Sequence, residues 1–308
     1  MPFYRMPDGE ALFVREFGQG EPVVVLSGLG MHSWQWLPFL YQHKKQYRFI
    51  IPDWRGFGGS NLCAVPELDA ISSHWQDLNS LLQQQNLQQF KLIGYSMGAT
   101  TAMHGMQYGQ LAAYLSSYLQ IDQAPKIGVD QNWPYGLFGN QHQQFKQLLI
   151  HLSEFLHDHA QYTDIHQMDI LQRKNLVELW LKFIELQASN KISPFLFKLA
   201  VKRPALQRYI LPTQRLDYLR WYIDNYLHHQ EDYREALTQL GCPTVFFTGA
   251  QSTLYAAEGQ RQVVEAMPNA KQVIFHQSGH TPLLTEPLKF CQEIGRFLKL
   301  NSSKQLKC

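Results

Sequence analysis

The sequence predicts an α/β protein in which a mostly parallel central sheet is flanked by helices and carries an inserted block of further helices. Two observations predict this fold. Short unbroken apolar runs such as Val23–Leu26 indicate strands that are buried on both faces, as the strands of a parallel sheet are. These runs alternate with segments of helical spacing, which is the pattern of strand–helix–strand units. The alternation stops between residues 125 and 236, where helical patterns follow one another.

The first two strands are predicted to form a hairpin, because Pro2–Met6 and Ala11–Phe17 flank the turn sequence Pro7-Asp8-Gly9. Strands and helices then alternate, and Ser72 or Ser73 is the expected N-cap of the first long helix. Further strands are expected at Val23–Leu26, Tyr47–Ile51, Phe90–Ile93, Tyr118–Ile121, Thr244–Thr248 and Gln272–Phe275, and helices at Ile71–Gln85, Met97–Tyr108, Glu258–Ala266 and Pro287–Leu298.

The inserted block divides the chain into a core, residues 1–124 and 237–308, and a helical cap, residues 125–236. Helices inserted above the carboxyl ends of parallel strands cover the crevice in which such sheets bind ligands. Aromatic side chains at helical spacing usually belong to a core, so we expect most of them to pack and a minority to line a pocket. The expected cap helices are Gln143–Phe155, Leu176–Ala188, Pro194–Leu206 and Leu216–His229, and their aromatic residues are Phe145, Phe155, Trp180, Phe183, Phe195, Phe197, Trp221 and Tyr222.

The bulk composition excludes several classes of protein. A hydrophobic content of 45% and a charged content of 17% are typical of a packed globular chain. The formal net charge of +2 is too small to predict nucleic acid or an anionic membrane as the main partner. No apolar run is long enough to span a bilayer, and the N-terminus lacks the pattern of a secretory signal. The four cysteines lack metal-type spacing, so reduced thiols in the cytoplasm are expected. A homodimer is compatible with the sequence.

The stretch Gly94-Tyr95-Ser96-Met97-Gly98 carries a candidate nucleophile. It matches the pattern Gly-x-Ser-x-Gly, and it lies between the expected strand Phe90–Ile93 and the expected helix Met97–Tyr108. A strand–turn–helix connection of this kind exposes a serine in a strained conformation, and the helix N-terminus provides positive potential for an oxyanion. The flanking glycines allow the strand and the helix to pack closely. We therefore predict that Ser96 is the nucleophile.

His280 is the candidate general base for this serine. It lies in Gly279-His280-Thr281-Pro282, after the last expected strand, where the chain order serine, acid, histidine places the base. His276 is the nearest rival, but it ends the strand itself. We therefore assign the base to His280.

In these residues, the chain resembles the α/β-hydrolase superfamily, in particular its cap-bearing esterase, C–C hydrolase and haloperoxidase-like branch. The resemblance covers Met1–Pro125 and Leu240–Leu300 and implies the α/β-hydrolase fold. It rests on four segments, Ser27-Gly28-Leu29-Gly30, Asp53–Ser60, Gly94–Gly98 and Gly279-His280.

The resemblance also implies roles for two of these segments. In the family, the first segment is usually His-Gly-x, and backbone N–H groups form the oxyanion hole; carried over, the donors are those of Leu29 and Met97. Ser27 stands in place of the usual histidine, which leaves the backbone donors intact. The Asp53–Ser60 loop is mainly architectural in the family, so a structural ion pair between Asp53 and Arg55 is expected.

The chain departs from the family at the acid. The carboxylate normally follows the strand that corresponds to Thr244–Thr248, but here the turn reads Gly249-Ala250-Gln251-Ser252, with Ser252 where aspartate is expected. Asp122 is the preferred substitute, because it ends the strand Tyr118–Ile121 and some members of the superfamily place their acid there. Two alternatives stay open. Glu258 could serve, although it is expected at a helix start, or the site could lack an acid.

Metal and phosphate sites are weaker interpretations. His157-Asp158-His159 could supply metal ligands, but adjacent residues on a helix point to different faces. A solvated helix face is the expected structure there. The Gly56–Gly59 loop has neither the dinucleotide-binding nor the phosphate-loop spacing. We expect no cofactor and no metal.

These residues together predict a serine hydrolase that forms an acyl-enzyme on Ser96. The apolar cap favours a small-molecule substrate that is an uncharged, fairly apolar carboxylic ester, lactone or thioester. The same apparatus could run C–C bond hydrolysis, perhydrolysis or acyl transfer. A proline-releasing aminopeptidase would use the cap carboxylates Asp158, Asp164 and Asp169 to bind the substrate amine. The alternative from another class is a non-catalytic ligand-binding protein on the same scaffold.

Overall fold

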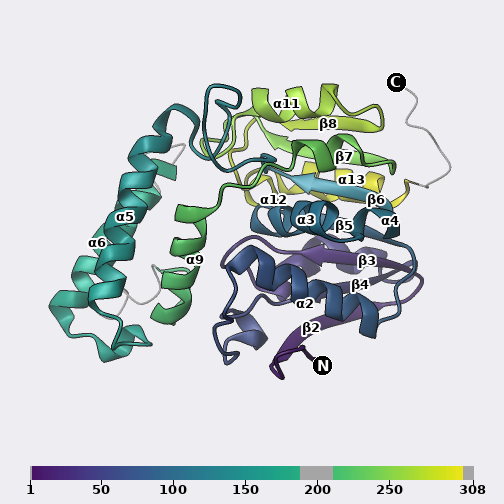
Figure 1. Cartoon of the computed structure of the whole chain (residues 1–308). Coiled ribbons are helices and arrows are strands. Elements are labelled where there is room, and N and C mark those ends of the chain that lie inside the picture. The colour runs from purple at the N-terminus through teal and green to yellow at the C-terminus, as the bar shows by residue number, and fades with distance from the viewer. Residues whose placement is uncertain (1, 188–210, 301–308) are drawn as a thin grey trace.

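A computed structural model describes residues 2–187 and 211–300 of the chain. Eight strands form one sheet in the order β1-β2-β4-β3-β5-β6-β7-β8 (Figure 1). The first two pairings, β1 with β2 and β2 with β4, are antiparallel, and the strands from β4 to β8 are parallel. This confirms the predicted hairpin and the predicted fold class. The strands are β1 (Phe3–Arg5), β2 (Ala11–Gly18), β3 (Glu21–Leu26), β4 (Tyr47–Pro52), β5 (Phe90–Tyr95), β6 (Leu115–Ile121), β7 (Thr244–Gly249) and β8 (Ala270–Phe275).

Helices cover both faces of the sheet, because successive side chains of each buried strand point to opposite faces. On β3, Val24 and Leu26 belong to one buried cluster, and Val23 and Val25 belong to another. The first cluster includes residues of α2, α3 and α11, and the second includes residues of α1 and α13. The core helices are α1 (Leu37–Leu40), α2 (Ala70–Gln84), α3 (Met97–Tyr108), α4 (Leu111–Tyr114), α10 (Arg234–Thr238), α11 (Ala257–Glu265), α12 (Pro282–Thr285) and α13 (Pro287–Leu298).

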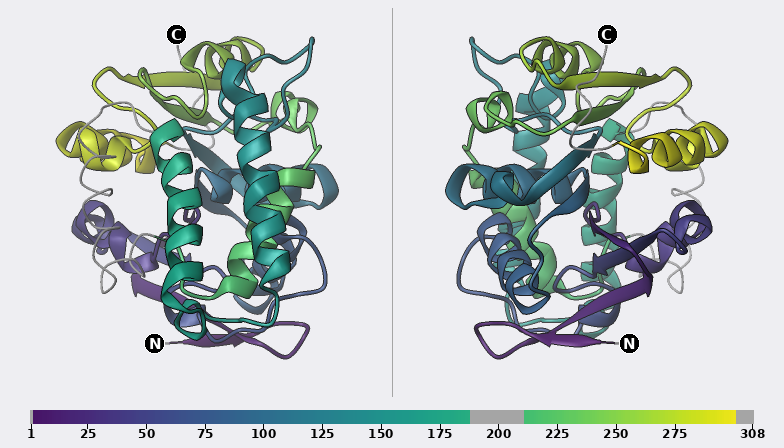
Figure 2. Two further views of the ribbon diagram at one scale, coloured as in Figure 1. Left: turned by 90° about the vertical axis from the view of Figure 1, so that its left-hand side faces the viewer. Right: turned by 90° about the vertical axis from the view of Figure 1, so that its right-hand side faces the viewer.

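Three further helices, α5 (His142–Asp158), α6 (Ile170–Gln187) and α9 (Leu216–His228), lie beside one another at one end of the sheet (Figures 1 and 2). They are called the cap helices below. They correspond to three of the four helices predicted between residues 125 and 236. The fourth, Pro194–Leu206, lies outside the described residues. None of the helices in the described ranges combines the length and the apolarity that a bilayer crossing requires.

Helix α2 begins one residue before the predicted start, and its N-cap differs from the prediction. The Asp69 carboxylate accepts hydrogen bonds from the N–H groups of Ile71 and Ser72, both at 3.0 Å. Ser72 and Ser73 lie inside the first turn. A carboxylate at the N-cap also interacts favourably with the positive end of the helix. An uncharged serine hydroxyl lacks this charge interaction.

The loop after β4 is held by buried polar contacts, but the predicted ion pair between Asp53 and Arg55 is wrong. The Asp53 carboxylate instead accepts hydrogen bonds from the backbone N–H groups of Ser33 (2.5 Å) and Gly59 (2.9 Å). The Arg55 guanidinium makes a two-pronged contact with the Asp77 carboxylate on α2, with both N···O distances 2.7 Å. It also pairs with Asp8 at 2.5 Å. The guanidinium fork favours such a bidentate partner over a carboxylate that already binds backbone donors.

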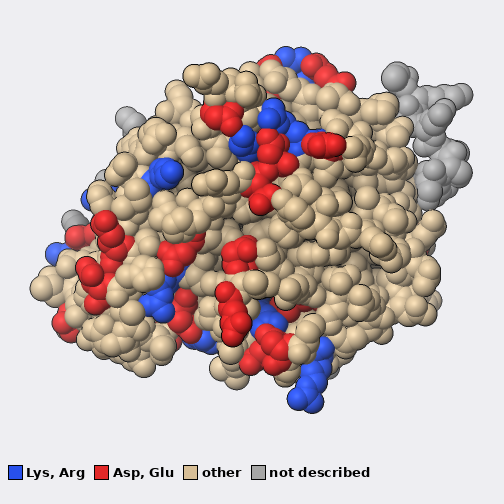
Figure 3. Space-filling view, in the orientation of Figure 1, with Lys and Arg blue, Asp and Glu red and all other residues tan. Residues whose placement is uncertain are grey.

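Acidic and basic side chains are intermixed on the face drawn in Figure 3. Charged side chains of the molecule form ion pairs, including Lys126 with Asp130 and Arg261 with Glu258. Exposed pairs of this kind contribute little to stability, but they keep charge of one sign from accumulating over this face.

Candidate active site

Ser96 occupies a strained turn between β5 and α3. Its φ and ψ angles are 50° and −121°, which non-glycine residues rarely adopt. A side chain at Gly94 would bring its Cβ to 2.8 Å from the Ala99 Cα, and one at Gly98 would approach the Leu26 carbonyl oxygen to 2.2 Å. Both glycines are therefore needed for β5 and α3 to pack this closely, as the sequence pattern predicts. The turn leaves the Ser96 side chain at the cavity described below.

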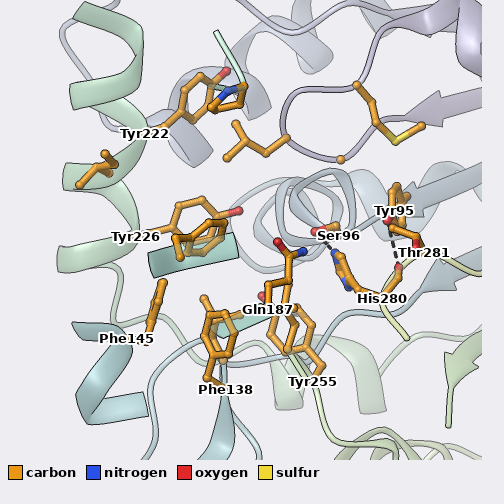
Figure 4. Close-up of a pocket in the computed structure, with 18 of the residues that line it drawn as sticks. Tyr95, Ser96, Phe138, Phe145, Gln187, Tyr222, Tyr226, Tyr255, His280 and Thr281 are labelled. Carbon is orange, nitrogen blue, oxygen red and sulfur yellow. Dashed lines mark hydrogen bonds between the residues drawn. The ribbon is translucent and has the colours of Figure 1, made fainter. Parts of the chain in front are cut away.

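The ends of three parallel strands bring Ser96, His280 and Asp122 into contact. The Ser96 Oγ lies 2.9 Å from the His280 Nε2 (Figure 4). The His280 Nδ1 lies 2.8 Å from the Asp122 Oδ2. Asp122 is fully buried, and the His280 side chain is 10% exposed. Glu258, the alternative acid, instead pairs with Arg261 at 2.6 Å, and this contact lowers the pKa of its carboxyl. The geometry allows a proton to pass from the serine to the imidazole, whose other nitrogen is held by a carboxylate.

The Asp122 carboxylate is surrounded by hydrogen-bond donors. Its Oδ1 accepts from the Gly249 N–H at 3.0 Å and from the Gln260 amide at 3.1 Å. Its Oδ2 accepts from the Ser252 hydroxyl at 2.6 Å as well as facing His280. Such donors offset the cost of burying a carboxylate away from water. Ser252, at the usual position of the acid, therefore contacts Asp122, the residue that the sequence predicts as the acid.

Sequence reasoning missed two residues of this cluster. Gln260 is a polar residue on the buried face of α11, beside Gly259 and Val263, and that interruption of an apolar face was the available signal. Tyr95 donates its hydroxyl hydrogen to the His280 carbonyl at 2.9 Å and stacks on the imidazole at a centroid distance of 5.3 Å. Burial raises the pKa of Tyr95, so the hydroxyl stays a neutral donor. Nothing in the sequence indicated that Tyr95, a variable position of the Gly-x-Ser-x-Gly motif, contacts the histidine.

The backbone N–H groups of Leu29 and Met97 are available to a ligand. Met97 is the first residue of α3, so its N–H has no acceptor within the helix. Neither N–H donates a hydrogen bond to another residue in the described part of the chain. The loop that carries Leu29 is anchored at Ser27, whose hydroxyl accepts from the Trp36 indole at 3.0 Å and whose carbonyl accepts from the Trp54 indole at 2.7 Å. Leu29 lines the same cavity as Ser96, and Met97 directly follows Ser96 in the chain, so the two N–H groups stay the predicted oxyanion donors.

A cavity of about 320 Å³ lies between the strand ends and the cap helices, and both Ser96 and His280 line it. Its walls are mostly apolar. Four of the predicted cap aromatics line it, Phe155 and Trp221 do not, and Phe195 and Phe197 lie outside the described residues. A larger share of the cap aromatic residues than predicted thus lines the pocket. The reason is that the inner faces of the cap helices border a cavity and not a packed core. The four are Phe145, Trp180, Phe183 and Tyr222.

The residues considered as metal ligands do not converge. His157 pairs with Asp224 at 3.1 Å, and His159 stacks on Phe155 at a centroid distance of 4.3 Å. Among the residues that the structure describes, no group of three His, Cys, Asp or Glu side chains could hold a metal ion. The two histidines therefore have structural partners within the cap helices.

Residues 23–293 match the model of the alpha/beta hydrolase family, and the chain belongs to this family. The match confirms the resemblance that the four sequence segments indicate. A pimeloyl-[acyl-carrier protein] methyl ester esterase from Legionella pneumophila (strain Corby) is 27% identical over 285 residues, which are 92% of this chain and 98% of the relative. A protein of the same name from Vibrio vulnificus (strain YJ016) is 24% identical over 281 residues, 91% of this chain and 95% of the relative.

The fold is also found in solved structures of esterases. The esterase EaEST from Exiguobacterium antarcticum superimposes with a TM-score of 0.72 at 21% sequence identity, over 97% of this chain and 99% of that structure. At this level of identity, the likeness shows the shared fold.

Proposed function

We propose that this chain is a serine hydrolase of carboxylic esters, with Ser96 as nucleophile, His280 as general base and Asp122 as the acid that orients the base. The observation that carries the proposal is the continuous hydrogen-bonded row from the Ser96 Oγ through both nitrogens of His280 to the Asp122 Oδ2, with distances of 2.9 and 2.8 Å. A serine, a base and a buried carboxylate in this order are the parts that acyl transfer to serine requires.

In the proposed reaction, the His280 Nε2 takes the hydroxyl proton while the Ser96 Oγ attacks the ester carbonyl carbon. The resulting oxyanion accepts hydrogen bonds from the Leu29 and Met97 N–H groups. The imidazolium then protonates the alcohol oxygen as the C–O bond breaks, which leaves an acyl group on Ser96. Water, deprotonated by the same imidazole, attacks this acyl group and releases the acid.

The substrate that we propose is an uncharged ester with a fairly apolar acyl chain. The cavity is lined mainly by aliphatic and aromatic side chains, which favours apolar over charged ligands. The relatives from Legionella and Vibrio are named as esterases of a pimeloyl-[acyl-carrier protein] methyl ester. We therefore place methyl esters of medium-length acyl chains first, with lactones and thioesters as related substrates. In this proposal, residues 125–236 are the cap that covers the cavity.

The aminopeptidase alternative finds no support in the cap carboxylates. Asp158, Asp164 and Asp169 are absent from the lining of the cavity as the structure describes it. Asp164 accepts a hydrogen bond from the His166 N–H, and Asp169 accepts one from the Gln172 N–H, both at 2.8 Å. These two carboxylates thus stabilise helix starts within the cap.

Labelling with a fluorophosphonate, together with hydrolysis of methyl and p-nitrophenyl esters, tests the proposed function. We expect the wild type to be labelled and active, and Ser96→Ala to be neither. Ser80→Ala is the matched control, since Ser80 lies on α2, does not line the cavity, and accepts a hydrogen bond from the Gln84 amide. A wild type that is neither labelled nor active would contradict the proposal and favour a ligand-binding protein.

The cytoplasmic location and the compatibility with a homodimer stay predictions from the sequence. The described cysteines, Cys63, Cys242 and Cys291, are free thiols. Cell fractionation and sedimentation of the purified chain would test the two predictions.

A further inference from the structure

Two polar groups project from the cap helices into the apolar cavity. Tyr226 on α9 and Gln187, the last residue of α6, both line it. Figure 4 shows the Tyr226 hydroxyl and the Gln187 carboxamide pointing toward the side on which Ser96 and His280 lie. The end of α6 is held in place by Thr253, whose hydroxyl donates to the Gln187 carbonyl at 2.8 Å. The two groups therefore face the reacting serine from the opposite wall.

Neither polar group is used by the protein itself in the part of the chain that the structure describes. No hydrogen bond joins the Tyr226 hydroxyl or the Gln187 carboxamide to another described residue. Two other tyrosines that line the cavity differ in this respect. The Tyr95 hydroxyl donates to the His280 carbonyl, and the Tyr222 hydroxyl donates to the Arg55 carbonyl, both at 2.9 Å. Unlike the hydroxyls of Tyr95 and Tyr222, the Tyr226 hydroxyl therefore has no hydrogen-bond partner among the described residues.

An unpaired hydroxyl or amide on an apolar wall costs free energy, so such groups in native structures usually have a partner that is a ligand or water. In ligand-binding cavities, a small number of polar groups among apolar walls fixes the orientation of the ligand. Burial raises the pKa of Tyr226, so its hydroxyl stays protonated and can donate. The Gln187 carboxamide also donates through its NH₂ group. Two donors that face the same space suit a carbonyl oxygen, which has two lone pairs.

We infer that Tyr226 and Gln187 form a binding subsite for a second carbonyl group of the substrate, separate from the ester carbonyl that Ser96 attacks. This inference rests on the proposed ester hydrolysis and narrows its substrate class. The preferred substrate is an uncharged ester whose chain bears a hydrogen-bond-accepting carbonyl, such as a ketone, an amide or a second ester. A plain alkyl ester fills the apolar space but leaves both donors unpaired.

Matched substrate pairs test this subsite. Methyl esters of unbranched alkanoic acids are compared with methyl oxoalkanoates of the same chain length, in which the second carbonyl occupies successive positions. The measured quantity is the ratio of kcat/KM for the oxo ester to that for the plain ester. We expect one position to be preferred by roughly tenfold in the wild type, as two net hydrogen bonds would give.

Two conservative variants then test which side chain produces the preference for the oxo ester. Tyr226→Phe removes only the hydroxyl, and Gln187→Leu removes the amide while keeping the size of the side chain. Each is expected to lower the ratio by about threefold, which is the value of one neutral hydrogen bond. Tyr218→Phe is the matched control on the same helix. Tyr218 does not line the cavity, and its hydroxyl donates to the Cys63 and Ala64 carbonyls, so the variant should keep the wild-type ratio.

A wild-type ratio near one at every carbonyl position would overturn the subsite, and so would an unchanged ratio in both Tyr226→Phe and Gln187→Leu. Failure of the proposed function has a different signature, namely no hydrolysis of any ester and no fluorophosphonate labelling of Ser96. In that case, calorimetric titration of the wild type with the same ester pairs gives the ratio as dissociation constants. Equal constants would then overturn the subsite, and tighter binding of one oxo ester would support it.

Discussion

The ends of β6 and β7 lie side by side. The residue after β6 carries a buried carboxylate, and the end of β7 with its loop carries groups that donate hydrogen bonds to this carboxylate. Strand β6 is followed by Asp122, which is fully buried at a φ of 41° and whose N–H donates to the Phe247 carbonyl of β7 at 2.8 Å. Strand β7 ends at Gly249, and its loop supplies donors, the Gly249 N–H and the Ser252 hydroxyl. Asp122, the proposed acid, thus follows one strand, and two of the groups that donate hydrogen bonds to it come from the end of the next. We therefore expect the position of the carboxylate oxygen to matter more for catalysis than the strand that provides it, which the variants below test.

The largest expected effect comes from removing the charge at the end of β6. We predict that Asp122→Asn lowers kcat for ester hydrolysis by about four orders of magnitude, because an amide holds the wrong tautomer of His280. Steady-state ester kinetics measure the loss. Asp130→Asn, which changes a surface aspartate paired with Lys126, should behave as the wild type. Activity of Asp122→Asn within tenfold of wild type would refute the assignment of the acid and leave the nucleophile untouched.

Moving the charge to the β7 loop tests the comparison directly. The Ser252 Oγ lies 2.6 Å from the same Asp122 oxygen that faces His280, so a carboxylate at position 252 can reach this region. We predict that adding Ser252→Asp to Asp122→Asn restores kcat by at least about tenfold over the single variant, since a carboxylate near the imidazolium is regained. A double variant that is no more active than Asp122→Asn would show that only β6 can hold the acid.

The close approach of the β7 end to the loop of His280 predicts a loss of stability. A Cβ at Gly249 would lie 2.0 Å from the Gly279 carbonyl oxygen. Gly249→Ala should therefore lower the free energy of unfolding by about 1–3 kcal/mol, as overpacking does. Denaturant titration measures this, with Gly241→Ala as the matched control, because a Cβ at Gly241 meets no atom within 4 Å. Equal stability of the two variants would show that the loops adjust freely.

The smallest effect is expected from removing one donor to the carboxylate. We predict that Ser252→Ala lowers kcat by roughly threefold to tenfold, because the Gly249 and Gln260 donors remain. Ser252→Thr keeps the hydroxyl and should recover most of the rate. Ester kinetics of the three proteins decide the outcome, and a Thr variant as slow as the Ala variant would point to a packing role for Ser252.

The sequence predicted the strands and helices of the core well because their periodicity is a local property. The strand before Ser96, the helix after it and the position of His280 all follow from residues that are close in the chain. Contacts between segments that lie far apart in the chain were harder to predict from the sequence. The partner of Arg55 is Asp77 on α2, and the N-cap of α2 is Asp69, because both choices depend on which groups the folded chain brings near.

In the candidate site too, features that depend on nearby residues were predicted better than contacts between distant segments. Asp122 was favoured because it ends a neighbouring parallel strand, and its contact with His280 agrees with that expectation. Gln260, which lies eleven residues beyond the end of β7, was not foreseen. Its place on the apolar face of α11 was a signal, but only the packing of α11 brings its amide to Asp122. The inward-facing groups of Tyr226 and Gln187 were also not foreseen, because the direction of a side chain on a cap helix depends on how that helix packs.

The two indole contacts at Ser27 have a consequence for the temperature dependence of the reaction. Trp36 and Trp54 follow Ser27 in the chain and bind its hydroxyl and its carbonyl, and both indoles are fully buried. The loop that carries Leu29 is therefore ordered before any substrate arrives, and no conformational entropy is lost there as the transition state forms. The entropy of activation should therefore be more negative in Trp36→Phe than in the wild type, a difference that an Eyring plot of ester hydrolysis would measure.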